Sequence, residues 1–335
     1  MDNMVFYLET GSLDPAFNLA FEEYVLTHRK EGVYLLLWQN DNTIVIGQNQ
    51  NAEAEINRSF VEEHNIRVVR RSTGGGAVYH DLGNLNYSFI TDVGNAEELA
   101  MERFTYPVVK ALKALGLSAE TSERNDILID GKKVSGTAQR VARTRILHHG
   151  TLLFDTNCAM VAGALNVDPE KFRSKSVKSV RSRIGNIRSY LRTDMDLQPF
   201  WMYLKGALTG CSLCETTLTS QELDAVWNLK TEKYDTWEWT YGRSPQYNLM
   251  NKHYWPGGCL EVRADVDHGI ITDLVFYGDF LAVKNMDPIT NSLRGCAFRV
   301  EDFGHLLDQF DLPAFFGAIT KEEILKTVFY ASSTD

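Results

Sequence analysis

Hydrophobic positions near the N-terminus recur with the spacing of an α-helix. Phe17, Phe21 and Val25 lie four residues apart and therefore share one helical face. Just before them, Asp14 can cap a helix and Pro15 is favoured in a first turn. We predict a helix that begins at Pro15 and buries its apolar side.

Two pairs of short strand-forming runs predict β-hairpins. An Asn-Asp-Asn turn separates the runs 33–38 and 43–47, and an Asp-Gly turn separates the runs 127–129 and 132–134. Asp-Gly is a strong turn signal because both residues tolerate the positive φ angles of tight hairpins. We therefore expect each pair of runs to form adjacent antiparallel strands.

The other periodic segments mix strands and helices without regular alternation. Further strands are predicted at 67–70, 85–90 and 145–154, with two or three more within 259–285. Further helices are predicted at 98–115, from Thr219 onward and at 321–330. Turn-forming residues near 241–245 indicate a linker. This order favours an α+β fold over a doubly wound parallel sheet.

Length and charge limit the class of protein. A chain of 335 residues is long enough for two domains, each with its own core. Its net charge of −10 argues against binding nucleic acid over the whole surface, because that binding depends on neutralising phosphates. No apolar run approaches the ~20 residues of a membrane span, and no signal peptide is evident at the N-terminus. We expect a cytoplasmic protein with neither nucleic acid nor membrane as a partner.

The densest chemical signal is a glycine-rich stretch that follows a predicted strand. Arg70 and Arg71 precede Gly74, Gly75 and Gly76. Three glycines have no packing value of their own, but their bare backbone N–H groups can approach an anion closely. A flexible turn is the plain alternative, although the arginines favour a phosphate or carboxylate site. The spacing matches neither the Walker nor the dinucleotide-binding pattern, and His80 beside Asp81 is more typical of a structural histidine.

Lysine on the second arm of the Asp-Gly hairpin is a second candidate. Lys133 could place a fixed cation in a pocket, where it would suit a phosphate or an activated carboxylate. Taken alone, adjacent lysines beside a turn are more typical of a solvated surface.

Two further clusters have less specific patterns. The segment 171–192 contains eight lysines or arginines and no acidic residue, as expected for a solvated face, an anionic ligand or an acidic protein partner. The spacing of Cys211 and Cys214 permits a zinc or redox pair, but without a second pair it is more typical of core packing.

Five stretches together resemble the lipoate–protein ligase A family, within the biotin/lipoate ligase superfamily. They are Arg-Arg-Ser-Thr-Gly-Gly-Gly-Ala-Val-Tyr-His-Asp-Leu-Gly-Asn at 70–84, Arg-Asn-Asp at 124–126, Lys-Val-Ser-Gly at 133–136, His-His-Gly-Thr-Leu-Leu at 148–153 and Ser-Val-Arg-Ser-Arg at 179–183. The resemblance extends over nearly the whole chain. It implies a large mixed-sheet α+β catalytic domain over 1–244 and a smaller α+β accessory domain over 250–335, which would change orientation between the two reaction steps about a linker near Pro245.

The resemblance also implies a reaction. Free lipoate and MgATP would give lipoyl-AMP and pyrophosphate, and the lipoyl group would then pass to a lysine of a lipoyl domain, a salvage of exogenous lipoate. The acceptors would be acyltransferase subunits of 2-oxoacid dehydrogenases, the glycine-cleavage H protein, or both. ATP and Mg²⁺ are thus the implied cofactors and lipoate the substrate.

Roles for individual residues follow from the same resemblance. Lys133 would be the catalytic lysine, bridging the lipoate carboxylate and the α-phosphate. Nucleotide contacts would come from Arg71, Gly75, Gly76, Ala77, Val78 and Tyr79, with Arg70, Asn125 and Asp126 beside them. The acyl tail needs an apolar slot, for which the first helix and the 33–47 segment are candidates. The basic segment would serve ligand closure or docking of an acidic lipoyl domain; the metal ligands are not assigned.

Three other functions use related chemistry. An octanoyl or lipoyl transferase would carry the acyl group on a cysteine thioester, for which Cys158 is the candidate nearest in sequence to the lysine motif. Biotin ligation follows the same adenylation logic, but the Arg-Arg-x-x-Gly-Gly-Gly pattern is of the lipoate type. A lipoate-binding protein without catalysis is the third alternative, although the presence of Lys133 and Arg71 favours an enzyme.

Overall fold

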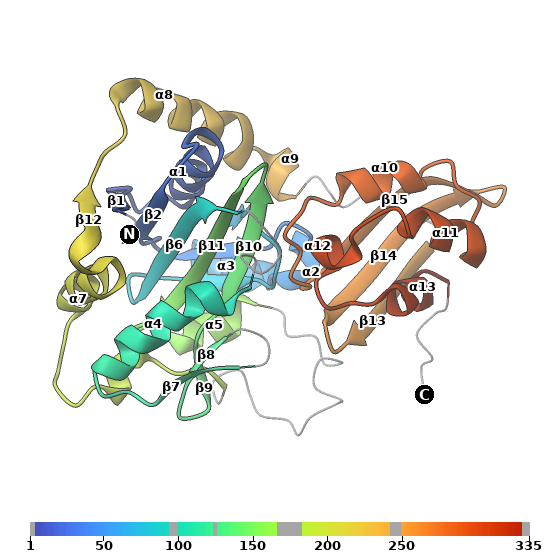
Figure 1. The fold of residues 1–335 in the computed structure, drawn as a ribbon. Coiled ribbons are helices and arrows are strands. Elements are labelled where there is room, and N and C mark those ends of the chain that lie inside the picture. The colour runs from blue at the N-terminus through green and yellow to red at the C-terminus, as the bar shows by residue number, and fades with distance from the viewer. Residues whose placement is uncertain (1–3, 94–99, 123–125, 166–182, 242–248, 330–335) are drawn as a thin grey trace.

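The computed structural model describes residues 4–93, 100–122, 126–165, 183–241 and 249–329. In this part of the chain, an N-terminal assembly of three sheets lies beside a C-terminal sheet with its own helices (Figure 1). The predicted linker falls within residues 242–248, outside the described residues.

The largest sheet has six strands in the order β10-β11-β6-β2-β1-β12. Their bounds are β1 Val5–Glu9, β2 Val33–Trp38, β6 Asn84–Asp92, β10 Thr137–Ala142, β11 Arg145–Leu153 and β12 Leu213–Glu215. The strands β12, β1 and β2 run parallel, whereas β2, β6, β11 and β10 are antiparallel neighbours. The sheet is therefore mixed.

Helices bury both faces of this sheet. Helix α1 (Pro15–His28) and helix α8 (Ser220–Leu229) pack on one face, and α4 (Glu102–Ala114) and α7 (Leu197–Thr209) pack on the other. The predicted start of α1 is confirmed, since the Asp14 carboxylate accepts hydrogen bonds from the N–H groups of Ala16 and Phe17. A capping box at Thr219 likewise begins α8. The segment after α8 continues as the π-helix η5 (Lys230–Tyr234) and α9 (Trp237–Thr240).

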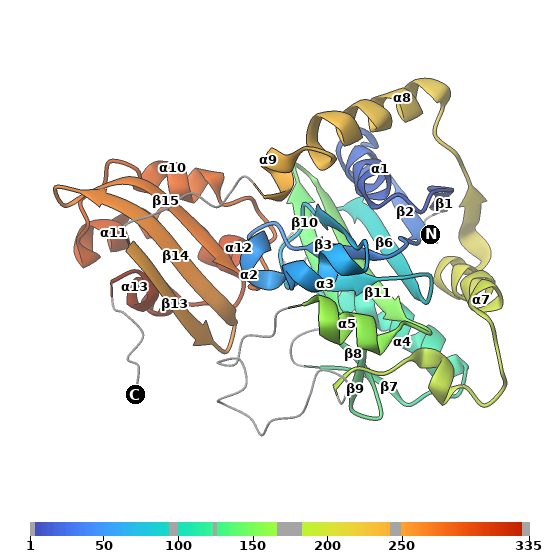
Figure 2. The same cartoon turned by 180° about the vertical axis from the view of Figure 1, so that it is seen from behind.

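The first predicted hairpin is wrong. Strand β3 (Thr43–Ile46) does not pair with β2 but lies in a second sheet, between β4 (Arg67–Arg70) and β5 (Val78–His80). Both runs are almost wholly buried, so their apolar side chains do not indicate which neighbour each strand pairs with. The helices α2 (Ala52–Glu55), α3 (Arg58–Glu63) and α5 (Cys158–Ala164) pack on this sheet, with α3 and α5 side by side (Figure 2).

The second predicted hairpin is confirmed. Strands β8 (Ile127–Ile129) and β9 (Lys132–Ser135) are antiparallel, and β7 (Ala119–Thr121) completes their sheet. Asp130 and Gly131 adopt φ angles of 50° and 74°, the left-handed conformations that their residue types tolerate. The turn therefore holds Lys133 at the start of a short, firmly paired strand.

The C-terminal sheet is an antiparallel meander, β13 (Leu249–Trp255), β14 (Gly258–Asp267) and β15 (Ile270–Gly278). Its helices are α10 Asp287–Leu293, α11 Val300–Leu307, α12 Leu312–Phe316 and α13 Lys321–Phe329. Together they enclose a separate hydrophobic core. The end of β15 and the segment after it contact the N-terminal assembly. Gly278 N–H donates to the Asn49 carbonyl at 2.7 Å, and the Val283 carbonyl accepts from Val141 N–H at 2.9 Å.

Two short 3₁₀ turns complete the described elements, η3 (Ile187–Tyr190) and η4 (Gly210–Ser212). None of the helices in the described ranges is long and apolar enough to cross a bilayer.

Candidate active site

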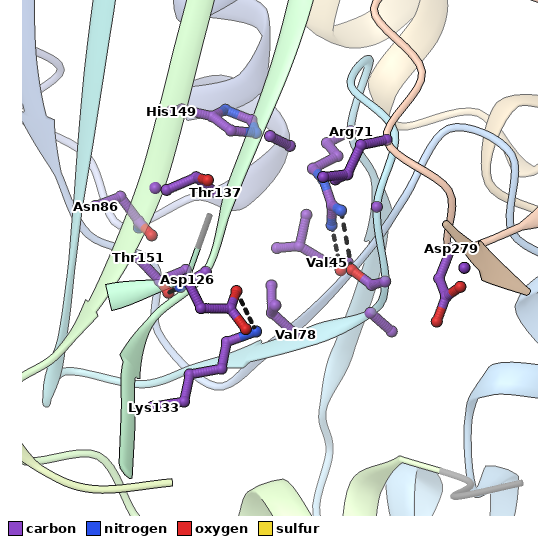
Figure 3. Close-up of a pocket in the computed structure, with 18 of the residues that line it drawn as sticks. Val45, Arg71, Val78, Asn86, Asp126, Lys133, Thr137, His149, Thr151 and Asp279 are labelled. Carbon is purple, nitrogen blue, oxygen red and sulfur yellow. Dashed lines mark hydrogen bonds and ion pairs between the residues drawn. The ribbon is translucent and has the colours of Figure 1, made fainter. Parts of the chain in front are cut away.

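A cavity of about 340 Å³ lies where the six-stranded sheet, the glycine-rich loop and the C-terminal sheet meet. Lys133 and Asp126 lie at one end and His149 at the other, with Val45 and Val78 between them (Figure 3). We call these the lysine end and the histidine end of the cavity. The arrangement brings together segments that are far apart in sequence.

The glycine-rich loop between β4 and β5 forms one wall. Gly75, Gly76, Ala77 and Val78 border the cavity, as the predicted nucleotide contacts require. Gly75 has a φ of +87°, a backbone angle that residues other than glycine rarely adopt. At Gly74 a Cβ atom would lie 2.9 Å from the backbone nitrogen of Ala282, so the C-terminal segment approaches too closely for any side chain there.

Arg71 organises this loop from inside. Its guanidinium donates hydrogen bonds of 2.6–3.1 Å to Thr73 Oγ1 and to the carbonyls of Val45, Gly74 and Gly76. Burial lowers the pKa of Arg71 to about 10, partly offset by the nearby carboxylate of Glu22, so the group is a cation at neutral pH. Arg71 therefore sets the shape of the loop, and its contact with nucleotide stays a prediction.

Arg70 points away from the cavity. Only 1% of the residue is exposed, and it is not among the residues that border the cavity. Its guanidinium donates at 2.6–3.0 Å to the carbonyls of Gly47, Gln48, Gln50, Trp239 and Thr240. Nucleotide binding by Arg70 stays a prediction that this placement does not favour, because the side chain ties the β3–α2 turn to α9.

Successive side chains of β5 point to opposite sides of the strand, so only alternate residues face the cavity. Val78 and His80 border the cavity, whereas the Tyr79 side chain faces the opposite side and donates to Asn42 Oδ1 at 2.9 Å. Burial raises the pKa of Tyr79 to about 12, with Asp81 adding to the effect. Tyr79 is not among the residues that border the cavity, and its contact with nucleotide stays a prediction.

The lysine end is charged and partly open to water. Lys133 Nζ lies 2.9 Å from Asp126 Oδ1, with the two side chains 40% and 25% exposed. Beyond them, Gly185 N–H donates to the Lys133 carbonyl at 2.9 Å, so the basic segment is anchored on β9 at this residue. Asn125, predicted beside Asp126, lies outside the described residues.

The histidine end contains a buried polar network that sequence reasoning missed. His149 Nδ1 lies 2.9 Å from Glu22 Oε1, and His149 Nε2 lies 2.8 Å from Thr73 Oγ1. Ser88 donates to the same Glu22 oxygen at 2.6 Å and accepts from Trp38 Nε1 at 2.9 Å. The signal available in the sequence was the pair of histidines in the 148–153 motif, although nothing local links them to a glutamate of the first helix.

Apolar walls join the two ends. Leu19 of α1, Trp38 of β2 and Val45 of β3 border the cavity, as expected if the first helix and the 33–47 segment line an acyl slot. They reach it from two different sheets and a helix, which is possible only because β2 and β3 are not a hairpin.

The C-terminal sheet supplies a further wall. Asp279 and Leu281, just after β15, and Ala318, just after α12, border the cavity beside the glycine-rich loop, and Gly75 N–H donates to the Phe280 carbonyl at 3.2 Å. Asp279 Oδ1 accepts from Cys259 N–H at 2.6 Å, which directs the carboxylate. The sequence carried no signal for these contacts.

Several other candidates lie elsewhere. Cys158 begins α5, where its Sγ contacts the Thr156 carbonyl at 3.7 Å, and it is not among the residues that border the cavity. Arg188, in the basic segment, forms ion pairs of 3.0–3.1 Å with Asp155, Asp194 and Asp196. Residues 171–181, with most of the basic side chains, lie outside the described part of the chain, as does the side chain of Cys211. Among the described residues, no three His, Cys, Asp or Glu side chains are grouped to hold a metal.

Family models match both parts of the chain. The lipoyl protein ligase A/B catalytic domain matches residues 14–209, and the bacterial lipoate protein ligase C-terminus matches residues 244–328. The chain is 41% identical to lipoate-protein ligase LplJ of Bacillus subtilis, covering 97% of this chain and 100% of that protein. It is 38% identical to lipoate–protein ligase 1 of Staphylococcus aureus, covering 96% and 99%.

Solved structures show the same fold. LipL1 of P. falciparum in complex with lipoate has a TM-score of 0.79 at 23% identity, covering 92% of this chain and 95% of that one. The bipartite ligase of Thermoplasma acidophilum, described with its E2 lipoyl domain, has a TM-score of 0.64 at 31% identity, covering 74% and 100%. Lipoate-protein ligase A bound with ATP has a TM-score of 0.62 at 27% identity, covering 72% and 99%. The likeness confirms the predicted α+β fold class.

Proposed function

Because the chain belongs to the lipoate–protein ligase family, we propose that it activates free lipoate with ATP to lipoyl-AMP and transfers the lipoyl group to a lysine of a lipoyl domain. The observation that carries this proposal is the position of Lys133. It is a partly exposed cation at one end of a cavity that is also bordered by the glycine-rich loop and by the apolar side chains of Leu19, Trp38 and Val45. That is the arrangement a fatty acid with one reacting carboxylate requires.

In the first step, a lipoate carboxylate oxygen attacks the α-phosphorus of ATP, and the bond to pyrophosphate breaks. In this proposal Lys133, a cation at the lysine end of the cavity, contacts both the carboxylate and the α-phosphate, and its charge stabilises the negative charge that builds up between them. The backbone of Gly76, Ala77 and Val78 faces the same space and supports the phosphates.

In the second step, the amine of the acceptor lysine attacks the acyl carbon, an amide forms and AMP leaves. The lipoyl tail meanwhile stays between Leu19, Trp38 and Val45, which hold the acyl carbon in place at the lysine end. We propose dehydrogenase acyltransferase subunits or the glycine-cleavage H protein as acceptors, and the cytoplasm as the compartment.

The residues present fit a magnesium ion that arrives with the nucleotide. Mg²⁺ commonly takes one or two carboxylates together with phosphate oxygens and water. Among the described residues, Asp126 and Asp279 are the carboxylates that border the cavity, so they are the side chains that would hold it. When bound, the ion would neutralise phosphate charge.

We also propose the domain limits 1–244 and 250–335, with the smaller part changing its orientation between the steps. The separate C-terminal core supports independent movement of that part. Its contacts with the glycine-rich loop through Gly75 and Phe280 would have to break during such a movement.

The direct test is the ATP-dependent mass gain of a purified lipoyl domain incubated with the enzyme and lipoate. An acceptor whose target lysine is replaced by Arg should gain no mass, and omission of ATP should abolish the reaction. An unchanged mass of the native acceptor, under conditions where the enzyme is folded, would contradict the proposal.

The same assay distinguishes the proposed ligase from a transferase that carries the acyl group on a cysteine thioester. Cys158→Ser should leave the rate unchanged, because Cys158 does not border the cavity. Loss of activity in that variant would instead favour a transferase. Biotin in place of lipoate should neither shift the unfolding temperature nor support a mass gain.

A further inference from the structure

Gly136 turns the side of its backbone that would carry a Cβ atom toward the ion pair of Lys133 and Asp126 (Figure 3). A Cβ atom there would lie 3.1 Å from both Cε and Nζ of Lys133 and 3.7 Å from Asp126 Oδ1. Non-bonded carbon atoms attract each other at about 3.5–4.0 Å. A side chain at position 136 and the lysine in its observed place therefore exclude each other.

An irregularity in β9 produces this close approach. In a regular strand, residues three positions apart point to opposite faces, so Lys133 and Gly136 would not meet. The register between β8 and β9 slips by one residue after Lys133, which leaves Val134 as an extra residue. Such a bulge bends a strand and redirects its side chains. Gly136 thus comes to face the same side as the lysine.

The backbones on both sides of the contact are anchored. Gly136 N–H donates to Thr151 Oγ1 at 3.2 Å, and the Gly136 carbonyl accepts from Thr151 N–H at 3.0 Å. The backbone of Lys133 is paired with β8 on one side and accepts from Gly185 N–H on the other. The movable part of the contact is therefore the lysine side chain.

The backbone itself does not require glycine at position 136. Gly136 does not adopt a positive φ angle, unlike Gly131 in the turn of the same hairpin. Its hydrogen bonds to Thr151 use backbone groups that alanine also has. The nearest atoms that a methyl group would meet belong to the end of a flexible side chain. Alanine therefore fits the fold and displaces the ammonium of Lys133.

We propose that Gly136 is a positioning residue for the activation of lipoate: because it has no side chain, the Lys133 ammonium lies against its backbone, at the place where the carboxylate and the α-phosphate meet. This inference rests on the proposed function, which assigns those two contacts to Lys133. A displacement of about 1 Å in a reacting group can slow a reaction about 100-fold. One methyl group on Gly136 should thus reduce activity without reducing stability.

The first test compares pyrophosphate release, at saturating lipoate and ATP, with the free energy of unfolding. Gly136→Ala should slow release about 10- to 100-fold. Its free energy of unfolding should stay equal or rise slightly, because alanine restricts the unfolded chain.

Gly304→Ala is the matched control. In α11, a Cβ atom on Gly304 would also face the end of a lysine, Lys321, at 3.5 Å, and that lysine is paired with Asp308. Gly304 does not border the cavity, so this variant should keep the wild-type rate.

A double variant separates positioning from simple obstruction of the cavity, which Gly136 borders. If the methyl group acts through the lysine, Lys133→Ala combined with Gly136→Ala should be as slow as Lys133→Ala alone. A further fall in the double variant would overturn the inference. A wild-type rate in Gly136→Ala, or a large loss of its stability, would do the same.

A nuclear Overhauser effect between the Lys133 ε protons and a Gly136 α proton tests the contact in the wild-type protein without turnover. We expect this effect in the ligand-free protein, and its absence would overturn the inference whether or not Gly136→Ala folds. If the effect is present but a lipoyl domain gains no mass, the placement of Lys133 is supported and the proposed function is contradicted.

Discussion

The two ends of the cavity hold their polar groups in different ways. At the lysine end, one ion pair joins two partly exposed side chains, Lys133 and Asp126. At the histidine end, Glu22 and His149 are buried, and each has more than one hydrogen-bond partner. Water competes with contacts at the first end but not at the second.

This difference matches what each end would do in the proposed reaction. At the lysine end, the substrate carboxylate, the phosphate and the acceptor lysine would have to arrive and leave in turn, so contacts there must break easily. A wall that selects the shape of a substrate needs contacts that persist, and buried, fully bonded networks are rigid. Removing one group should therefore affect activity most at the lysine end and stability most at the histidine end.

Lys133→Ala should have the largest effect. We expect the rate of pyrophosphate release to fall by about 100- to 1,000-fold, as when an electrostatic donor to a developing charge is removed. The folded state should be little affected, because the side chain is 40% exposed. Lys132→Ala, in the exposed neighbouring residue, is the control and should stay within about twofold. Comparable rates in the two variants would remove Lys133 from the mechanism.

Glu22→Gln should have the next largest effect, on stability. The Glu22 carboxylate accepts hydrogen bonds from Ser88 and His149. In glutamine, the amide NH₂ group would face these hydrogen-bond donors and could not accept from them. We expect the free energy of unfolding to fall by about 2–3 kcal/mol, measured by chemical denaturation. Glu62→Gln, in an exposed ion pair with Arg58, should change it by less than about 0.5 kcal/mol. A similar small change for both would show that the histidine end is not rigidly bonded.

Stability should also fall as the pH is lowered. Burial lowers the pKa of His80 to about 3, against 6.5 for a free histidine, so the unfolded chain binds the proton first. The stabilisation is complete above pH 6.5 and decreases as the pH falls toward 3. Between pH 7 and 5 this one group should cost about 1–2 kcal/mol.

Denaturation of His80→Gln at several pH values checks this expectation. The variant should show a shallower loss of stability than the wild-type protein between pH 7 and 5. His268→Gln, whose side chain is 93% exposed, should follow the wild-type curve. An unchanged slope in His80→Gln would mean that this end is more hydrated than the buried ring indicates.

Asp126→Asn should have the smallest effect on stability. Its ion pair with Lys133 is partly exposed, and such pairs contribute about 0–1 kcal/mol. The unfolding temperature should therefore shift much less than in Glu22→Gln, measured by thermal denaturation at the same pH. A shift as large as that of Glu22→Gln would break the contrast between the two ends.

Local signals predicted much of the secondary structure. The cap at Asp14, the Asp-Gly turn and the capping box at Thr219 depend on groups a few residues apart, so they can be recognised along the chain. The pairing of β3 could not be predicted in this way. Its four residues are all buried, and nothing within them distinguishes β2 from β4 as a neighbour.

The candidate site shows the same limit. The motif at 70–84 marked the loop, but the adjacent arginines have different environments, with Arg71 beside the cavity and Arg70 buried behind it. His80 looked structural in the sequence because no second ligand stood at a suitable spacing. The structure places His80 at the edge of the cavity, with Asn40, from the chain between β2 and β3, against its Nδ1.

By itself, the sequence determined the class of fold and the family and predicted which lysine is reactive, because short motifs and hydrophobic periods encode these features locally. Only the tertiary structure decided which side chains meet in the cavity. Glu22 and His149 are 127 residues apart, and their contact depends on packing α1 against β11. Asp279 reaches the glycine-rich loop only because the C-terminal sheet, which has a hydrophobic core of its own, lies beside that loop. Contacts of this kind arise from the burial of whole surfaces, which no single stretch of sequence specifies.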